Sequence, residues 1–184
     1  MIVASSLRAV AAVVAACALL AGCSEKSDKK EKARAPEAPA KVCWEAFDGA
    51  AVVPLLGTGK QVTEDTRDVF ALPADGKTVT CRVGVDGATT LTGQVSRKPL
   101  GSDAFWQAFD PMHPEKLDFG RKGLVWDFGA TLLYTCRTPT ESFELELEIS
   151  HNPTDMESTK VRALNTQLMK DFQDFTRTRL NCAP

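Results

Sequence analysis

The sequence contains only two histidines and a single tyrosine, and none of its six cysteines stands within three residues of another. Zinc and haem sites are usually built from closely spaced Cys and His ligands, so neither is expected here. The sequence also lacks the Gly-x-Ser-x-Gly pattern of many serine hydrolases and the Gly-x4-Gly-Lys-Ser/Thr pattern of a phosphate-binding loop. We therefore expect a protein with no catalytic residues, no metal and no cofactor.

Strong net charge and a second long apolar run are missing as well. The chain carries a net charge of −2, and from residue 42 onward twenty acidic side chains outnumber fifteen basic ones. An acidic domain lacks the Lys and Arg surface that neutralises phosphates, so nucleic acid is not an expected partner. No apolar run beyond the first 23 residues is long enough to cross a bilayer.

Residues 1–22 have the composition of a secretory signal peptide. Arg8 is the only charge before an apolar run over residues 9–20, and that run is too short for a spanning helix. It ends in Leu-Ala-Gly-Cys at residues 20–23, which resembles the lipobox of bacterial lipoproteins. The resemblance implies cleavage before Cys23, a diacylglycerol on its thiol and anchoring to membrane lipid on the outer face of the cell membrane. The alternative is an ordinary secretory signal that happens to contain a cysteine.

The next segment, residues 24–41, contains no apolar side chain larger than alanine, and it has six basic and four acidic side chains. Such a segment cannot bury enough apolar surface to offset the entropy lost on ordering. We expect residues 23–41 to comprise the lipidated cysteine and a disordered tether. Residues 42–184 then have a suitable length for a single domain.

Four cysteines lie in this domain: Cys43, Cys81, Cys136 and Cys182. An even number in an exported chain implies disulfides. Four cysteines permit three pairings, and sequence alone does not select one. We favour Cys43–Cys81 and Cys136–Cys182, because each would join the end of a helix to the interior of a strand.

Alternating residues predict an antiparallel sheet. Residues 78–85 alternate, and the following Asp86-Gly87 is a strong signal for a two-residue hairpin. Residues 143–149 alternate most regularly, with a solvent-facing row expected at Glu144, Glu146 and Glu148. We do not expect this row to be catalytic, because carboxylate catalysis needs one acid in an apolar pocket. Further strands are expected at residues 69–72, 89–96, 123–128 and 131–137, and short helices at residues 43–48, 50–56 and 104–110.

Several short segments occur twice in the same order. Residues 44–48 read Trp-Glu-Ala-Phe-Asp and residues 106–110 read Trp-Gln-Ala-Phe-Asp, and Thr-Cys-Arg occurs at residues 80–82 and again at residues 135–137. These matches predict two tandem helix–β–β–β units, residues 42–97 and 102–150, that share one core. Hairpins of independently similar composition are the alternative.

The C-terminal segment predicts a long helix over residues 155–180, since no Gly or Pro interrupts it. Thr154 and Glu157 fit a capping box. Apolar residues at spacings of three and four form one stripe, made of Val161, Leu164, Leu168, Phe172 and Phe175. A helix with this stripe should pack on the sheet, so the expected fold class is α+β.

Aromatic residues are concentrated between positions 105 and 128. Trp126, together with Phe119 and Phe128, could line a pocket for a hydrophobic ligand. The alternative is that these side chains fill the core.

The lipobox, the tether, the Val42-Cys43-Trp44 segment and the widely spaced cysteines together resemble the small secreted lipoproteins common in actinobacteria, many of which have no assigned function. This resemblance implies an extracytoplasmic location and a disulfide-linked α+β scaffold, and it supplies no catalytic residues. We expect a lipid-anchored, non-catalytic module that binds an envelope protein or a hydrophobic ligand. The alternatives are a cell-envelope hydrolase that uses carboxylates and an accessory subunit of a membrane complex.

Overall fold

The structure is a computed structural model that describes residues 34–67, 69–73, 78–99, 103–136, 141–150 and 156–182. The predicted signal peptide, Cys23, most of the predicted tether and Thr154 lie outside the described residues. Ala33–Pro184 form one compact unit. Its elements, in chain order, are β1 (Lys41–Val42), β2 (Phe47–Asp48), α1 (Gly49–Leu56), β3 (Val62–Asp65), β4 (Val79–Val85), β5 (Ala88–Lys98), η1 (Asp103–Met112), β6 (Glu115–Lys116), β7 (Lys122–Trp126), β8 (Gly129–Thr135), β9 (Ser142–Ile149) and α2 (Ser158–Arg179).

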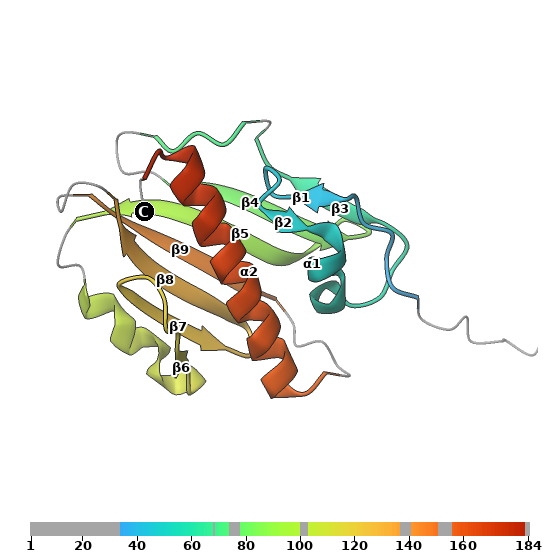
Figure 1. Ribbon diagram of the computed structural model, residues 1–184. Helices are drawn as coiled ribbons and strands as arrows, with labels where there is room; N and C mark the ends of the chain where they lie inside the picture. Colours follow the sequence, from blue (N-terminus) through green and yellow to red (C-terminus); the bar gives the residue numbers. More distant parts are fainter. Residues whose placement is uncertain are drawn as a thin grey trace, which may run out of the picture. The chain divides into compact units, whose positions relative to one another are not determined.

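A seven-stranded sheet forms the centre of the domain, in the order β3-β4-β5-β9-β8-β7-β6, with every neighbouring pair antiparallel. Helix α2 crosses one face of this sheet (Figure 1). The predicted α+β class, with an antiparallel sheet and a long C-terminal helix packed on it, is therefore confirmed. Asp86-Gly87 forms the predicted turn between β4 and β5, with positive φ angles of 51° and 88°.

The main core lies between the sheet and α2. Val161, Leu168 and Phe172 from the predicted stripe are buried, and Leu164 and Phe175 are partly buried against the same core. Helix α1 ends at Leu56, the predicted end, with Gly57 as its C-cap, and it adds Val52, Leu55 and Leu56 to this core. Two buried polar side chains on this face are hydrogen-bonded to each other, since the Tyr134 hydroxyl donates to Oγ1 of Thr176 at 3.0 Å.

The sheet is arranged symmetrically about the central β5–β9 pair. Three consecutive strands, β3, β4 and β5, run inward from one side, and three others, β7, β8 and β9, run inward from the other. Leu91 faces Ile149 and Val95 faces Leu145 across this pair. Two three-stranded units related by a twofold axis would give this arrangement. The strand order thus agrees with the predicted tandem units, with the two-residue strand β6 added at one edge.

The two Trp-containing pentapeptides do not occupy equivalent positions, so this part of the repeat prediction is wrong. Trp44 lies in the turn between β1 and β2 and belongs to the main core. Trp106 lies in η1 and packs against Phe109, which in turn contacts Trp126. Side chains alternate along a strand, and Val125 points into the main core, so Trp126 and its aromatic neighbours cover the opposite face. The repeated Thr-Cys-Arg segments also differ, because Cys81 lies within β4 and Cys136 follows the end of β8.

One predicted helix, at residues 43–48, and one predicted strand, at residues 69–72, are not present in the structure. Residues 43–48 do not form a helix; Cys43, Trp44 and Glu45 all have positive φ angles, and the chain turns directly from β1 into β2. Residues 69–72 do not form a strand, and the first strand of the sheet is β3 instead. Phe70 from this segment packs edge-on against Trp44 and Phe175. Its apolar character therefore serves tertiary packing rather than a strand.

The predicted disorder of the tether is wrong for residues 34–41. Glu37 forms a parallel bridge with Gln61, and the Glu37 amide donates to the Lys60 carbonyl oxygen at 3.0 Å. The Gly49 amide donates to the Ala40 carbonyl oxygen at 2.9 Å. Backbone pairing of this kind does not need large apolar side chains, which is why composition alone did not reveal it.

Both predicted disulfides are present, and they confirm the favoured pairing. The Cα atoms of Cys43 and Cys81 are 5.5 Å apart, and those of Cys136 and Cys182 are 4.8 Å apart. The first bridge joins the β1–β2 turn to the interior of β4. The second joins the end of β8 to the residue that follows the last turn of α2.

Candidate functional site

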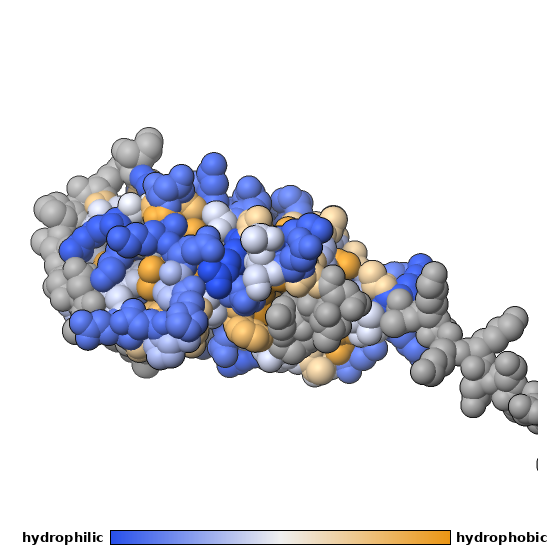
Figure 2. Space-filling view, turned by 90° about the horizontal axis from the view of Figure 1, so that it is seen from below, coloured by the Kyte–Doolittle hydropathy of each residue, from blue (hydrophilic) through white to orange (hydrophobic). Residues whose placement is uncertain are grey.

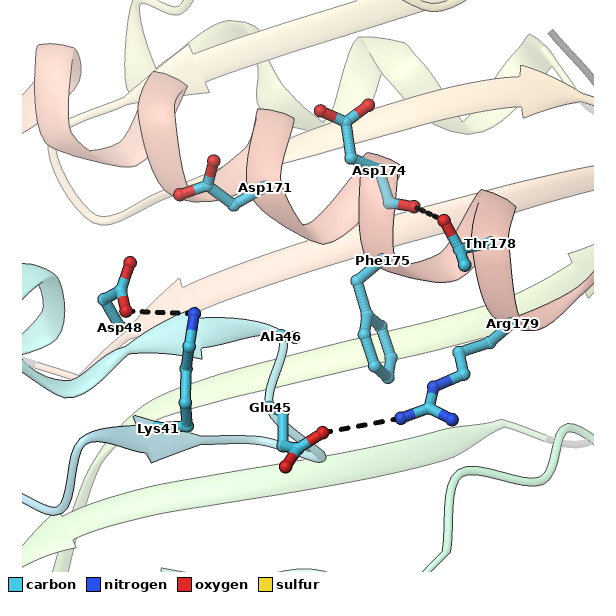
Figure 3. Close-up of a pocket in the computed structure, with 9 residues that line it drawn as sticks. All are labelled: Lys41, Glu45, Ala46, Asp48, Asp171, Asp174, Phe175, Thr178 and Arg179. Atoms are coloured by element: carbon cyan, nitrogen blue, oxygen red, sulfur yellow. Dashed lines mark hydrogen bonds and ion pairs between the residues drawn. The ribbon is translucent and has the colours of Figure 1, made fainter.

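An open groove lies between the C-terminal half of α2 and the β1–β2 turn, and we call it the α2 groove (Figure 3). Its volume is about 470 Å³. Figure 3 shows the β1–β2 residues on one side and the α2 residues on the other. It is lined by Lys41, Glu45, Ala46, Asp48, Asp171, Asp174, Phe175, Thr178 and Arg179.

The wall formed by the β1–β2 turn is fixed by hydrogen bonds, a disulfide and aromatic stacking. The Ala46 amide donates to the Cys43 carbonyl oxygen at 2.9 Å, and the disulfide fixes Cys43 to β4. The Cys43 amide also donates to Glu64 at 3.0 Å. Trp44 donates from Nε1 to the carbonyl oxygen of Arg67 at 2.9 Å, and its ring stacks on Phe175 with centroids 6.5 Å apart. The groove therefore exists before any ligand arrives, which lowers the entropy cost of binding.

Among the described residues, four acidic and two basic side chains line the α2 groove. Lys41 pairs with Asp48 at 2.9 Å, and Arg179 reaches Glu45 at 3.7 Å, so both basic groups are already matched by acids (Figure 3). Asp171 accepts a hydrogen bond from Gln167, and Asp174 adds a further exposed carboxylate. The charge of the lining is therefore net negative and favours ligands with cationic groups.

Sequence reasoning did not identify the α2 groove. The sequence places Lys41 in the tether and Asp48 in a helix that does not form. The only usable signal was the polar series Asp171, Asp174 and Thr178, which follows one side of the helix at spacings of three and four. A polar helix side is the ordinary solvent-facing side of an amphipathic helix, so this signal alone does not indicate a site.

The predicted solvent-facing glutamate row is corrected by the structure. Glu144 is only 6 % exposed, and its carboxylate forms an ion pair with the Lys98 ammonium group at 2.7 Å. Glu146 is half-buried, and Glu148 is exposed. Burial raises the pKa of the Glu146 carboxyl, and the charges of Glu144 and Glu148 raise it further. The sequence could not show this, because a strand pattern does not reveal whether a second layer such as η1 covers its polar face.

Replacing Glu146 with glutamine is expected to stabilise the protein at pH 7 by roughly 0.5 kcal/mol, the scale of a substitution outside the core. The folded-state pKa lies above the unfolded one, so the stability linked to Glu146 is present below the unfolded pKa and is lost as the pH rises through the folded pKa. The gain should therefore disappear as the pH falls to about 4, near the ordinary carboxyl pKa. Urea unfolding at pH 4 and pH 7 measures it, with Glu148→Gln as the exposed control. An equal gain at both pH values would contradict the assignment.

The three aromatic side chains of the predicted ligand pocket lie in three different environments. Trp126 is 4 % exposed and packs against Phe109 with ring centroids 4.9 Å apart. Phe119 is partly buried against the main core on the other face of the sheet. Phe128 is 44 % exposed in the turn after β7. The structure therefore does not bring them together around one cavity.

The described part of the chain shows neither a cluster of metal-ligating side chains nor a helix suited to cross a membrane. No group of three or more His, Cys, Asp or Glu side chains within it is placed to hold a metal ion. None of the helices in those residues combines the length and apolar character needed to cross a membrane. Among proteins of known family, curated proteins and solved structures, none matches this chain.

Proposed function

We propose that this chain is a lipid-anchored extracytoplasmic lipoprotein whose folded domain is a non-catalytic binding module. The observation that carries the binding role is the α2 groove, about 470 Å³ in volume, with one wall held by a disulfide. Two disulfides in the domain suit an oxidising location outside the cytoplasm. The Leu-Ala-Gly-Cys segment at residues 20–23 supports the anchor.

The lining of the α2 groove suggests what it would bind. Its net negative charge favours a partner with Lys or Arg side chains or another amine. The Phe175 ring at the groove offers an aromatic surface to such a cation, although Arg179 already lies 5.3 Å from the ring centroid. A cationic segment of an envelope protein fits this lining better than a purely hydrophobic ligand does.

An exposed apolar patch would instead favour an accessory subunit of a membrane complex. Figure 2 shows a face on which hydrophilic residues predominate and apolar ones form separate small groups. The large exposed apolar side chains of the described residues are Val69, Met112 and Phe128, and they come from different segments. This distribution favours a binding module with a local site over a subunit with a broad apolar interface.

Replacing Cys23 with serine is expected to move most of the protein from the membrane fraction to the soluble fraction, a change of roughly tenfold or more, because stable anchoring requires two acyl chains. Cell fractionation measures the distribution, and mass spectrometry of the mature N-terminus detects the acyl groups. Cys17→Ser lies within the predicted signal peptide and should leave the distribution unchanged. An unmodified Cys23 thiol in the mature wild-type protein would contradict the anchor.

The binding role is tested by a photo-crosslinking amino acid placed at Thr178, an exposed position of the α2 groove. In intact cells we expect a discrete crosslinked product, and Asp174→Lys should reduce it by reversing one groove charge. The same crosslinker at Thr159, exposed near the other end of α2, is the matched control. Equal products from both positions, insensitive to Asp174→Lys, would argue against the groove as the binding site.

A further inference from the structure

Several connections of the seven-stranded sheet lie at one end of it, which we call the Phe128 end. It is made of the start of β3 at Val62, the Asp86-Gly87 turn, the Asp127-Phe128 turn and the end of β9 at Ile149. The strand register places these segments together, because β3 starts opposite the end of β4, β9 ends opposite the start of β5, and β8 starts opposite the end of β9. The Ile149 amide also donates to the Phe128 carbonyl oxygen at 2.8 Å.

The described part of the chain begins at the same end of the sheet. The Gly59 amide donates to the Arg34 carbonyl oxygen at 3.1 Å, and a Cβ atom at Gly59 would collide with the Asp86 side chain. Arg34 therefore lies near the Asp86-Gly87 turn. Ten residues separate Arg34 from Cys23, which is a reach of at most about 40 Å. The Asp127-Phe128 turn is about five strand spacings from Arg34, or about 24 Å.

The opposite end of the sheet is much farther from the point where the chain enters. Helix α2 starts at the Phe128 end, where Oγ of Ser158 donates to Asp127 at 2.8 Å, and its 22 residues span about 33 Å. Val69 lies toward the opposite end, since the residue after it packs against Phe175 in the C-terminal half of α2. An anchor at Cys23 could bring Val69 to a membrane only if residues 24–33 ran back along most of the domain. The Phe128 end needs no such path.

The Asp127-Phe128 turn presents an apolar ring on a well-fixed backbone. Phe128 is the only aromatic residue among the large exposed apolar side chains of the described residues. The neighbouring Asp127 carboxylate accepts from Nε of Arg162 at 2.6 Å and from Ser158. Its charge is therefore already paired, so bringing this turn against a surface of low dielectric constant would not desolvate an unpaired carboxylate.

We propose that the Phe128 end faces the bilayer and that the Phe128 ring inserts into the phospholipid surface. This inference rests on the lipid anchor of the proposed function. Transfer of exposed aromatic surface into lipid is favourable, and the anchor would keep the turn at a high effective concentration beside the bilayer. The α2 groove is lined from the C-terminal half of α2, so this orientation would direct the groove away from the bilayer, where an envelope protein can reach it.

The test uses the mature acylated protein in vesicles of phosphatidylglycerol and phosphatidylethanolamine. Benzoylphenylalanine replaces Phe128 in one sample and Val69, another exposed apolar residue, in the matched control. After irradiation, mass spectrometry of the peptides measures the phospholipid adduct at each position. We expect at least about fivefold more adduct at position 128, the preference that burial of part of one aromatic ring can sustain.

A second variant separates the inserted ring from the orientation alone. With the crosslinker at Ala88, which is exposed at the same end, Phe128→Ser should lower the phospholipid adduct by a similar factor. Vesicle flotation reports the anchor separately. A protein that floats with the vesicles but gives no adduct at position 128, equal adducts at positions 128 and 69, or an Ala88 adduct unaffected by Phe128→Ser would overturn this proposal and leave the anchor standing. A protein that does not float would overturn both.

Discussion

Replacing Trp126 with alanine is expected to lower the free energy of unfolding by about 3–5 kcal/mol, the usual cost of removing a buried aromatic ring. Trp126 is almost fully buried, and its ring packs against Phe109 on the face of the sheet opposite α2. Removing it would leave a cavity between β7 and η1 and expose the ring of Phe109 that packs against it. Typical domains have only about 5–15 kcal/mol of stability in total, so the loss should be large in any unfolding experiment.

Urea unfolding of the full chain, followed by circular dichroism, measures this loss. Phe128→Ala removes an aromatic ring two residues away that is largely exposed, and it should change the free energy of unfolding by no more than about 0.5 kcal/mol. A Trp126→Ala protein with wild-type stability would show that the ring lines a ligand pocket instead. The pair of variants therefore decides between the two roles that the sequence left open for Trp126.

Removing the Cys136–Cys182 bridge in a double alanine variant is expected to lower the free energy of unfolding by about 4 kcal/mol. The bridge closes a loop with a sequence separation of 46 residues, and the chain-entropy relation gives this value for a loop of that length. Cys182 lies three residues after the end of α2 at Arg179, so loss of the bridge should also loosen the last turn of the helix. Denaturant unfolding measures the total effect, and amide hydrogen exchange locates it in the helix end.

The Cys43–Cys81 bridge is the matched comparison for that variant, because its sequence separation of 38 residues predicts nearly the same entropic effect. Its removal should instead affect the β1–β2 turn and the α2 groove. Both variants are double substitutions, so no unpaired thiol remains to form a wrong disulfide. A loss below about 1 kcal/mol from the Cys136–Cys182 variant would contradict the entropic account.

Regular periodicity is what made much of this fold predictable. The stripe along α2, the alternation in β4 and β9 and the Asp86-Gly87 turn each rest on a local pattern that the tertiary structure did not override. The capping box was less accurate, since Glu157 is the N-cap residue and its side chain makes no capping hydrogen bond. The residue at which a helix begins depends on the path of the preceding chain, and the local sequence pattern does not define that path.

The wrong structural predictions share a physical cause. In each case, contacts between residues far apart in the sequence determine the local structure. The Trp44 segment has a helical pattern, but a disulfide to β4 and stacking on Phe175 favour a turn with three positive φ angles. The glutamates of β9 have the pattern of a solvent-facing row, but lie on the face that η1 partly covers. The α2 groove is likewise assembled from residues far apart in the chain, such as Lys41 with Arg179. No local sequence pattern predicts that residues so far apart in the chain lie side by side.

The first disulfide has a mechanical consequence for a chain held at its N-terminus. Tension entering through residues 34–42 would first act on the backbone pairing of Glu37 with Gln61 and of β1 with β2. At Cys43 the pull would pass through the covalent bridge into β4, in the interior of the sheet. Residues 44–80 lie within the closed loop, so a pull that has reached Cys43 would not stretch their backbone. Stretching the tether would therefore extend the first few residues and leave the remainder of the domain folded until β4 itself gave way.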